Sequence, residues 1–306
     1  MNNKLMEIKQ DTKYWLIRPG VNSTFFDAFY KDGCVAMGWD RIGKIDEDEN
    51  IHSLEDLKRL VAEKYKDLLQ GKDSIREYKR KVSDIASKIY KFTYEVNEGD
   101  IIITPGDTSV LIGRVVGEVE IVNNKYMPEI KIDEEKYIGQ LNKTRKVEWI
   151  KKINKSKLEP NIKLELRVVH GISRISNKQV ITEINRTIYN YFTYNNEGHS
   201  IYKIKNEESI DFEKYAKFIA CINDIYSNVK NDNSKLYIKA NINSPGPIEL
   251  IGQVQIVEKI TNIMYCVFKI SDNRVPVDDQ ELVVEMKQRY EGITYDDYDF
   301  PCGGCM

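Results

Sequence analysis

The sequence has few of the residues on which most catalytic and metal centres depend. Its 306 residues include three histidines, His52, His170 and His199, in unrelated contexts and without a metal-binding spacing. It also has no Walker loop, no GxSxG nucleophile motif and no GxGxxG dinucleotide motif. These absences argue against the common NTPases, α/β-hydrolases and dinucleotide-dependent enzymes, and they predict no cofactor.

Cysteine is also scarce. The five cysteines form an odd set without the spacing of a disulfide framework, which predicts reduced thiols. Cys302 and Cys305 form a CxxC pair near the C-terminus, but no second CxxC or histidine pair is present to complete a zinc site. The pair is compatible with an inert tail, a metal or redox role, or a processing signal.

Long apolar runs are missing as well. No run approaches the roughly 20 residues that a membrane span needs, and the first five residues, Met-Asn-Asn-Lys-Leu, lack the hydrophobic core of a signal peptide. The hydrophobic fraction of 41% and the charged fraction of 31% are typical of a soluble globular protein. We therefore expect a cytoplasmic protein without a membrane partner.

Aromatic residues and short apolar segments are abundant. Residues 14–40 and 99–119 both have the pattern of short apolar strands separated by glycine turns, and the first segment sets Trp15 and Trp39 beside strand ends. Together they predict a small β-barrel with an aromatic-lined mouth. Such a mouth can hold a flat, uncharged ring such as a nucleobase, because every base offers a face for stacking.

The remaining patterns predict an α+β fold in which the barrel and its flanking helices are followed by a smaller α+β domain. Ser53 to Asp56 has the pattern of a capping box, which predicts the start of a helix. Helical periodicity predicts further helices at 24–31, 74–91, 178–191, 210–229 and 278–290. Extended segments are predicted at 13–18, 34–39, 101–104, 110–122, 145–150, 167–172, 235–243, 248–258 and 264–270.

A change of composition near Asn206 marks the predicted domain boundary. We expect a nucleic-acid reader domain over 1–205, an interaction or effector domain over 206–295, and an acidic tail with the CxxC pair over 296–306.

The charged residues are also unevenly distributed along the chain. Residues 142–189 hold twelve Lys or Arg against four Glu, whereas residues 278–299 hold two against eight Asp or Glu. A basic middle predicts a surface facing a polyanion, and ordinary solvated helix faces are the alternative.

Five motifs, in this order along the chain, resemble a known family. They are Tyr14–Gly20 (YWLIRPG), Gly33–Asp40 (GCVAMGWD), Gly99–Thr104 (GDIIIT), Ile112–Gly117 (IGRVVG) and Arg145–Trp149 (RKVEW). The set resembles an N-terminal module of Mrr-type restriction systems, which is related to the EVE and YTH members of the PUA-like superfamily. The resemblance covers half to two-thirds of the chain, and it implies a barrel that holds a base, often a modified base flipped out of its duplex.

The resemblance implies that Trp39 is a wall of the base pocket, with Trp15 and Arg18 as further candidates. For both tryptophans the alternative is a place in the core. Arg18 precedes a Pro-Gly turn, where its side chain can reach a pocket rim or simply be exposed. Thr104 begins a tight turn that can offer a hydroxyl and backbone amides to a ligand, or serve as a plain hairpin turn.

A basic run is the candidate for phosphate contacts, which give salt-sensitive affinity without sequence preference. It includes Lys143, Arg145, Lys146, Lys151 and Lys152. The segment 79–81, Lys-Arg-Lys, is positioned to extend the run from a helix. A solvated face is again the alternative.

The family's restriction members carry a nuclease domain after the reader, and here that signal is weak. Asp272, Glu285 and Lys287 have a tolerable spacing for a Mg²⁺-dependent nuclease, but the last two fall on a predicted helix instead of a buried strand. We therefore expect a non-enzymatic reader of DNA or RNA in bacterial defence against foreign nucleic acid. The alternatives are a nuclease, and a module that binds a protein partner through its C-terminal domain or acidic tail without binding nucleic acid.

Overall fold

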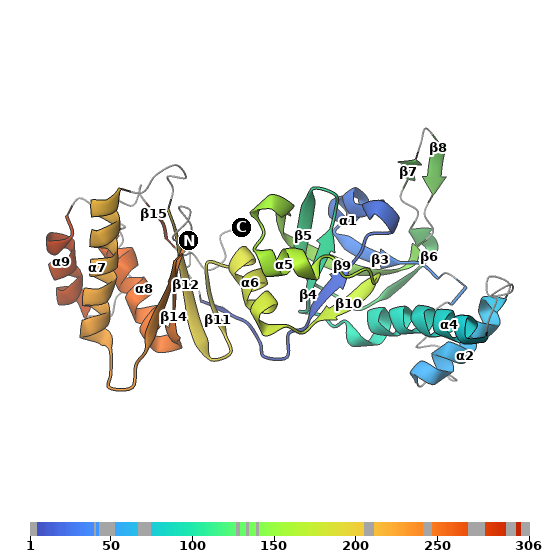
Figure 1. Cartoon of the computed structure of the whole chain (residues 1–306), viewed down its shortest axis with the longest axis horizontal. Helices are drawn as coiled ribbons and strands as arrows, with labels where there is room; N and C mark the ends of the chain where they lie inside the picture. The colour runs from blue at the N-terminus through green and yellow to red at the C-terminus, as the bar shows by residue number, and fades with distance from the viewer. Residues whose placement is uncertain are drawn as a thin grey trace. The chain divides into compact units, whose positions relative to one another are not determined.

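The computed structural model describes residues 5–39, 41–42, 53–66, 75–126, 129–132, 135–138, 141–204, 211–240, 247–268, 279–291 and 298–300. The chain forms two compact units (Figure 1). We call Thr12–Ile184 the curled-sheet unit, and Met1–Asp11 together with Asn185–Met306 the three-helix unit. Both combine helices with sheets, so the predicted mixture of α and β structure is confirmed. No helix in these described ranges is both long and apolar enough to cross a membrane.

A single curled sheet organises the first unit. Its strand order is β10 (Ile172–Ile175), β2 (Tyr14–Ile17), β4 (Ile101–Pro105), β5 (Ser109–Val115), β9 (Leu141–Asn154) and β3 (Cys34–Met37), with β6 (Glu120–Tyr126) also on β9. Only the β2–β4 pair in this sheet is parallel.

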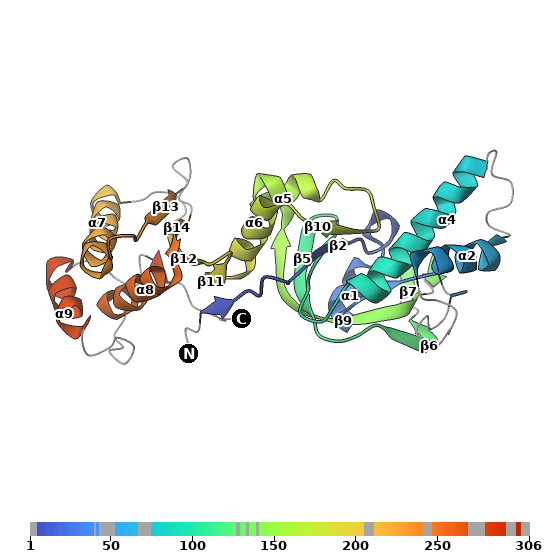
Figure 2. The ribbon, with the colours of Figure 1, turned by 90° about the horizontal axis from the view of Figure 1, so that it is seen from below.

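The curl comes from the long strand β9 (Figure 2). Its residues 147–154 pair with β5, whereas residues 143–146 pair with β3. The register shifts at Ile112 and Gly113, and a bulge of this kind bends a strand and increases its twist. Gly113 is required there, because a Cβ atom would lie 2.7 Å from the carbonyl oxygen of Glu148. The sheet therefore bends into a half-barrel.

Two amphipathic helices, α2 (Leu54–Lys64) and α4 (Ile75–Tyr90), pack against each other beside the sheet (Figure 2). Ser53 is the N-cap of α2 and accepts a hydrogen bond from the Asp56 amide, so the predicted helix start is confirmed. Their shared core contains Leu57, Val61, Tyr65, Val82, Ile85, Ala86 and Ile89. A π-helical turn, Lys91–Glu95, continues α4.

Shorter elements complete this unit. The helices are η1 (Val21–Ser23), α1 (Phe26–Asp32), η3 (Lys155–Lys157), α5 (Pro160–Glu165) and most of α6 (Lys178–Ile188), and β7 (Glu129–Ile132) pairs with β8 (Glu135–Ile138). The segment 167–172 was predicted to be extended, and this was wrong for all but its end, since β10 begins only at Ile172. The Val168 carbonyl of this segment instead accepts hydrogen bonds from the Arg18 side chain.

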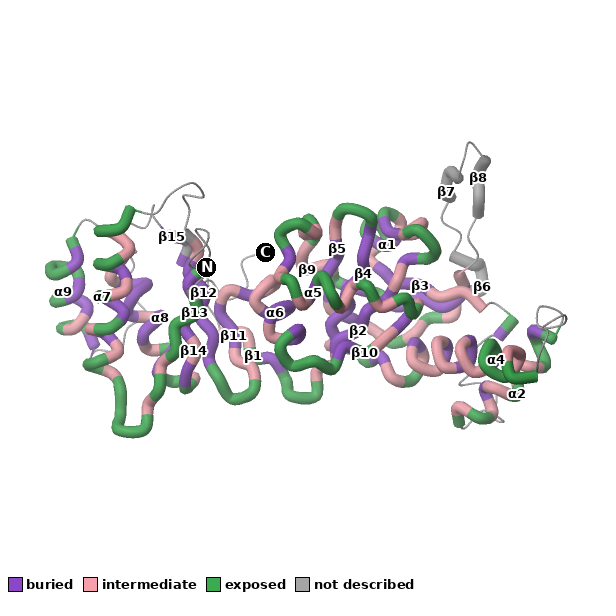
Figure 3. The backbone as a smooth tube through the Cα atoms, in the orientation of Figure 1, coloured by how far each residue is buried: buried purple, intermediate pink, exposed green. Residues whose placement is uncertain are grey.

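The second unit is a sheet with helices on one face. Its strand order is β1 (Met6–Glu7), β11 (Tyr191–Tyr194), β12 (Glu197–Ile204), β14 (Ile248–Gln253) and β13 (Leu236–Ala240), and β15 (Tyr298–Asp299) also pairs with β12. The helices α7 (Phe212–Val229), α8 (Val254–Phe268) and α9 (Gln280–Arg289) share one core with β12 and β14 (Figure 1). Figure 3 shows the buried residues concentrated on the sheets and the inner helix faces.

Two predictions for this part of the chain, one of secondary structure and one of the domain boundary, differ from what the structure shows. Residues 254–258 and 264–268 were predicted as strand, but they belong to the single helix α8. An apolar run that is buried on nearly every side has no clear period, so spacing alone does not separate a helix from a strand. The unit boundary also lies at Asn185 instead of 206, because β11 and β12 pair with each other and β12 pairs with β14 of the later sequence.

Candidate functional site

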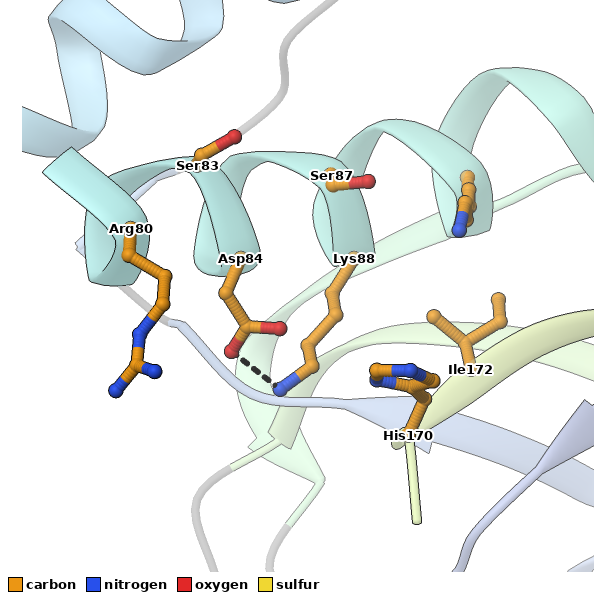
Figure 4. A pocket seen from close by; sticks show the side chains of 8 residues that line it. Arg80, Ser83, Asp84, Ser87, Lys88, His170 and Ile172 are labelled. Atoms are coloured by element: carbon orange, nitrogen blue, oxygen red, sulfur yellow. Dashed lines mark hydrogen bonds and ion pairs between the residues drawn. The ribbon is translucent and has the colours of Figure 1, made fainter. Parts of the chain in front are cut away.

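The curled-sheet unit has a basic groove between α4 and the segment that leads into β10 (Figure 4). Its volume is about 390 Å³. The groove is lined by Arg80, Ser83, Asp84, Ser87, Lys88, Lys91, His170 and Ile172. We refer to these eight residues as the basic groove.

The helical repeat explains why one side of α4 supplies most of the lining. Arg80, Asp84, Lys88 and Lys91 recur every three or four residues, so their side chains share one face. The opposite face is apolar and is buried against α2. His170 and Ile172 complete the groove from the other wall, and Figure 4 shows His170 below Lys88.

The lining is positively charged. It contains three cationic side chains, a histidine and one carboxylate. The carboxylate of Asp84 accepts an ion-paired hydrogen bond of 2.7 Å from Lys88, and both side chains are partly exposed. With one cation neutralised, the groove keeps the charge of Arg80 and Lys91 and the hydroxyl groups of two serines. This chemistry suits an oxyanion such as a phosphodiester.

A second feature of the unit is the strained turn that carries Trp39. Trp39 is half-buried and has a φ of 70°, a left-handed conformation that is unusual for a bulky residue. Its carbonyl oxygen accepts hydrogen bonds from the Lys143 ammonium (3.1 Å) and from the Ile42 amide (3.1 Å). Lys143 also donates to the Ile42 carbonyl at 2.7 Å. This buried lysine therefore holds the turn in place.

The indole of Trp39 meets an aromatic neighbour. Its ring centroid lies 5.4 Å from that of Tyr65, with the two planes 86° apart. The guanidinium of Arg41 lies 5.2 Å from the same phenol ring, and the Tyr65 hydroxyl accepts a hydrogen bond from the Arg41 amide. We call Trp39, Tyr65 and Arg41 the aromatic corner. It packs at the edge of the α2–α4 core.

Of the other predicted base contacts, Trp15 and Arg18 have hydrogen-bond partners within the unit. Trp15 is fully buried, and its indole N–H donates to the buried Asp100 carboxylate at 2.9 Å. Arg18 is half-buried and donates to the carbonyls of Leu166 and Val168. Trp15 and Arg18 are thus placed to hold the unit together, and the predicted core alternative describes Trp15. The Thr104 side chain is buried in β4, and its hydroxyl has no hydrogen-bond partner among the described residues.

The basic run divides between the interior and the surface. Lys143 and Arg145 are buried, and Arg145 donates to the carbonyls of Phe92, Thr93 and Gly117. This placement keeps both side chains away from a phosphate, because their charged groups already bind backbone oxygens inside the unit.

The other members of the run are more accessible. Lys146 is exposed and lies 3.4 Å from the Glu120 carboxylate. Lys152 is exposed, and its ammonium lies 4.7 Å from the ring centroid of Tyr30. Lys151 is half-buried. The structure does not bring these residues into the basic groove.

The structure does not bring the candidate nuclease residues or the CxxC pair together in a described site. Glu285 and Lys287 are both exposed on helix α9, as the helical pattern predicted, and Glu285 lies 3.7 Å from Arg289. Asp272, Cys302 and Cys305 lie outside the described residues. Within the described part of the chain, no three His, Cys, Asp or Glu side chains cluster as metal ligands would.

Sequence reasoning missed Lys88, Lys91 and His170 of the basic groove, and Tyr65 of the aromatic corner. A signal for the first two was present, since Arg80, Asp84 and Lys88 repeat on the polar face of α4 opposite a clear apolar stripe, and Lys91 follows in the π-helical turn. No signal linked His170 to α4, because the two are distant along the chain and meet only through the fold.

Comparison with known families assigns the curled-sheet unit. Residues 15–171 match the family model described as "Domain of unknown function (DUF8426)". The match covers more than half of the chain and falls within the curled-sheet unit, which contains both the basic groove and the aromatic corner. The chain therefore belongs to the DUF8426 family. No curated protein matches the chain, and neither does any solved structure.

Proposed function

We propose that this protein is a reader of nucleic acid, in which a PUA/EVE-like curled-sheet unit binds DNA or RNA. In this proposal the basic groove binds the phosphate backbone. Trp39, which lies on the α2 side of α4 and does not line the groove, stacks on a base, modified or flipped from its duplex. The setting that fits the sequence resemblance is cytoplasmic defence of a bacterium against foreign nucleic acid.

The basic groove is the observation that carries the proposal. A phosphodiester needs cationic and hydroxyl donors that are grouped together and open to solvent, and Arg80, Lys88, Lys91 and the serines of α4 supply them. The run along one helix face gives the groove a direction, as contact with successive phosphates requires. The interior cations Lys143 and Arg145 take no part.

The strain at Trp39 supports a role for its ring. A left-handed backbone costs on the order of 1–3 kcal/mol for a residue other than glycine, and such residues collect at ligand sites. Here a buried lysine, Lys143, offsets that cost by binding the Trp39 carbonyl. Glycine would satisfy the same turn without strain. A role for the indole ring would therefore account for a bulky residue at this position.

Fluorescence anisotropy with labelled single- and double-stranded oligonucleotides tests the groove. We expect salt-dependent binding by the full chain. The double variant Arg80→Glu/Lys91→Glu should weaken affinity by on the order of tenfold or more, and should lower the slope of log K against log salt by about 2. The double variant Lys79→Glu/Lys81→Glu is the matched control, since it makes the same charge change on the same helix outside the groove.

The control should retain more affinity than the groove variant. Equal losses in the two double variants would show a diffuse charge effect and would remove the groove from the proposal. Absence of binding to every DNA and RNA probe, methylated or not, would overturn the proposal itself.

Trp39 is tested with two variants. Trp39→Ala should reduce affinity by roughly 5- to 150-fold, the range expected for one lost stacking contact of about 1–3 kcal/mol. Trp39→Gly should reduce it equally, while its backbone suits the φ of 70°. A thermal melt identifies any loss of fold. Unchanged affinity in a folded Trp39→Gly variant would exclude Trp39 as the base wall.

A further inference from the structure

The sheet of the three-helix unit ends in the strand β13 (Figure 2). β13 pairs with β14 over five residues, from Leu236 opposite Gly252 to Ala240 opposite Ile248. Among the described strands, no other pairs with β13. Its outer edge therefore presents backbone N–H and C=O groups that can pair with a further strand.

Two large apolar side chains of this edge strand are exposed. Tyr237 is 57% exposed and Ile238 is 44% exposed, and Lys239 beside them is also exposed. Figure 3 draws the middle of β13 in the colour of exposed residues. Edge strands usually avoid pairing by being short or through charged side chains, prolines or bulges. β13 has a regular register without a bulge or a proline, and Lys239 is its one charged residue.

The register assigns each side chain to a face. Ile238 lies opposite Leu250, which is buried under the helices, so Ile238 points to the helix side of the sheet. Tyr237 and Lys239 point to the other side, because successive residues of a strand alternate between faces. An incoming strand would therefore meet Leu236 and Ile238 on the helix face, with an aromatic ring and a lysine on the opposite face.

We propose that β13 pairs with β13 of a second copy of this chain, antiparallel, about a two-fold axis that lies midway between the two copies of Ile238. The axis of such a pairing is perpendicular to the sheet and opposite residues lie on the same face, so the axis must lie between two copies of the same residue, by which we name it. Centring on Ile238, the middle residue, brings all five residues of the strand into pairing.

Charge supports this register over its neighbours. An axis through Tyr237 would set Lys235 opposite Lys239, and an axis through Lys239 would set two copies of that lysine opposite each other. Like charges in opposite positions destabilise a sheet. With the axis at Ile238, each Tyr237 instead lies opposite Lys239 of the second copy, where the ammonium can contact the aromatic face. The two Ile238 side chains pack together on the axis.

Sedimentation equilibrium at rising protein concentration tests the proposal in the full chain. We expect a monomer–dimer equilibrium with an affinity on the order of micromolar, since a single strand is a small interface. Ile238→Lys should abolish the dimer, because it sets two lysines together on the axis. Val284→Lys is the matched control on α9, where the side chain is 54% exposed, and it should leave the dimer intact.

Cross-linking checks the register. Ile238→Cys in a Cys302→Ser/Cys305→Ser background should give a covalent dimer with a short bismaleimide reagent, and Val284→Cys in the same background should not. The described cysteines Cys34, Cys221 and Cys266 are buried and should not react in the folded protein. A monomer at all concentrations, or a dimer that Ile238→Lys leaves unchanged, would overturn the proposal.

Discussion

The two units bury their charged side chains in different ways. In the curled-sheet unit, Lys143, Arg145 and Arg18 donate to backbone carbonyls. In the three-helix unit, Glu249 binds two side chains: His199 Nδ1 lies 2.9 Å from one carboxylate oxygen, and the Arg186 guanidinium lies 3.4 Å from the other. The His199 ring also stacks on Phe192, with ring centroids 4.6 Å apart.

This difference follows from where the carbonyl groups lie. The carbonyls that bind these cations belong to a π-helical turn, to loops and to the strained turn at Trp39, all outside the strands, and the long cationic side chains satisfy them. In the three-helix unit, the buried charges of Glu249 and Arg186 instead pair with each other beside the ladder of β12 and β14. The comparison shows that a run of lysine and arginine in a sequence can serve the interior of a fold as well as its surface.

The largest effect should come from removing a carbonyl-binding cation in the curled-sheet unit. Arg145→Met keeps the buried stem but leaves the carbonyls of Phe92, Thr93 and Gly117 without this donor. We expect the free energy of unfolding to fall by about 3 kcal/mol, measured by urea denaturation. Lys146→Met, at the adjacent exposed position, should change it by less than about 0.5 kcal/mol. Equal effects would mean that burial of Arg145 is not what matters.

The charge-paired cluster of the three-helix unit should be somewhat less sensitive to a shape-preserving change. Glu249→Gln removes the negative charge that Arg186 and His199 share but keeps one hydrogen-bonding oxygen. We expect a loss of about 2 kcal/mol in the same denaturation experiment. Glu197→Gln on the exposed end of β12 is the control and should be nearly neutral. If Glu249→Gln stabilised the protein, the desolvation cost of the cluster would exceed the free energy that its charge pairing contributes.

Helix caps should have similar effects in the two units, because they act locally. Ser53 accepts a hydrogen bond from the Asp56 amide at the start of α2, and Asp211 accepts one from the Lys214 amide at the start of α7. Ser53→Ala and Asp211→Ala should each cost about 1 kcal/mol. Hydrogen exchange of the first helical turn measures this directly. Unchanged protection in either variant would show that its cap contributes nothing.

The smallest expected effect is a pH dependence in the three-helix unit. Hydrogen bonds from Tyr290 and Arg289 hold the pKa of the Asp224 carboxyl below its usual value. Because the folded pKa is lowered, the stabilisation is present at neutral pH and is lost as the pH falls below about 4, near the unfolded pKa of about 3.9. Asp224→Asn should remove this part of the acid sensitivity of the melting temperature. The exposed Asp232→Asn should retain it, and identical pH profiles for both variants would contradict the assignment.

Periodicity and capping identified most elements of the curled-sheet unit in advance. The strands at residues 14–17, 34–37 and 101–105, the helices α2 and α4, and the N-cap at Ser53 all follow from local pattern. Prediction failed where the local pattern does not distinguish a helix from a strand. Helix α8 is apolar on nearly every side and has no distinguishing period.

The candidate site was predictable only in part. Trp39 stood out from its place in a motif, and Arg80 from the basic segment on α4. Their surroundings did not, since the partner of Trp39 is Tyr65 of α2 and the far wall of the groove is His170, which lies about eighty residues beyond α4. Contacts between residues so distant along the chain are set by how the sheet curls.

The sequence by itself determined where helices and strands form, because those choices depend on the spacing of apolar residues and on the residues at each end. Only the tertiary structure decided which cations of residues 143–152 face inward. The strand β9 changes partners along its length, and side-chain direction relative to the core depends on that pairing and its bulge. A list of basic residues holds no information about either.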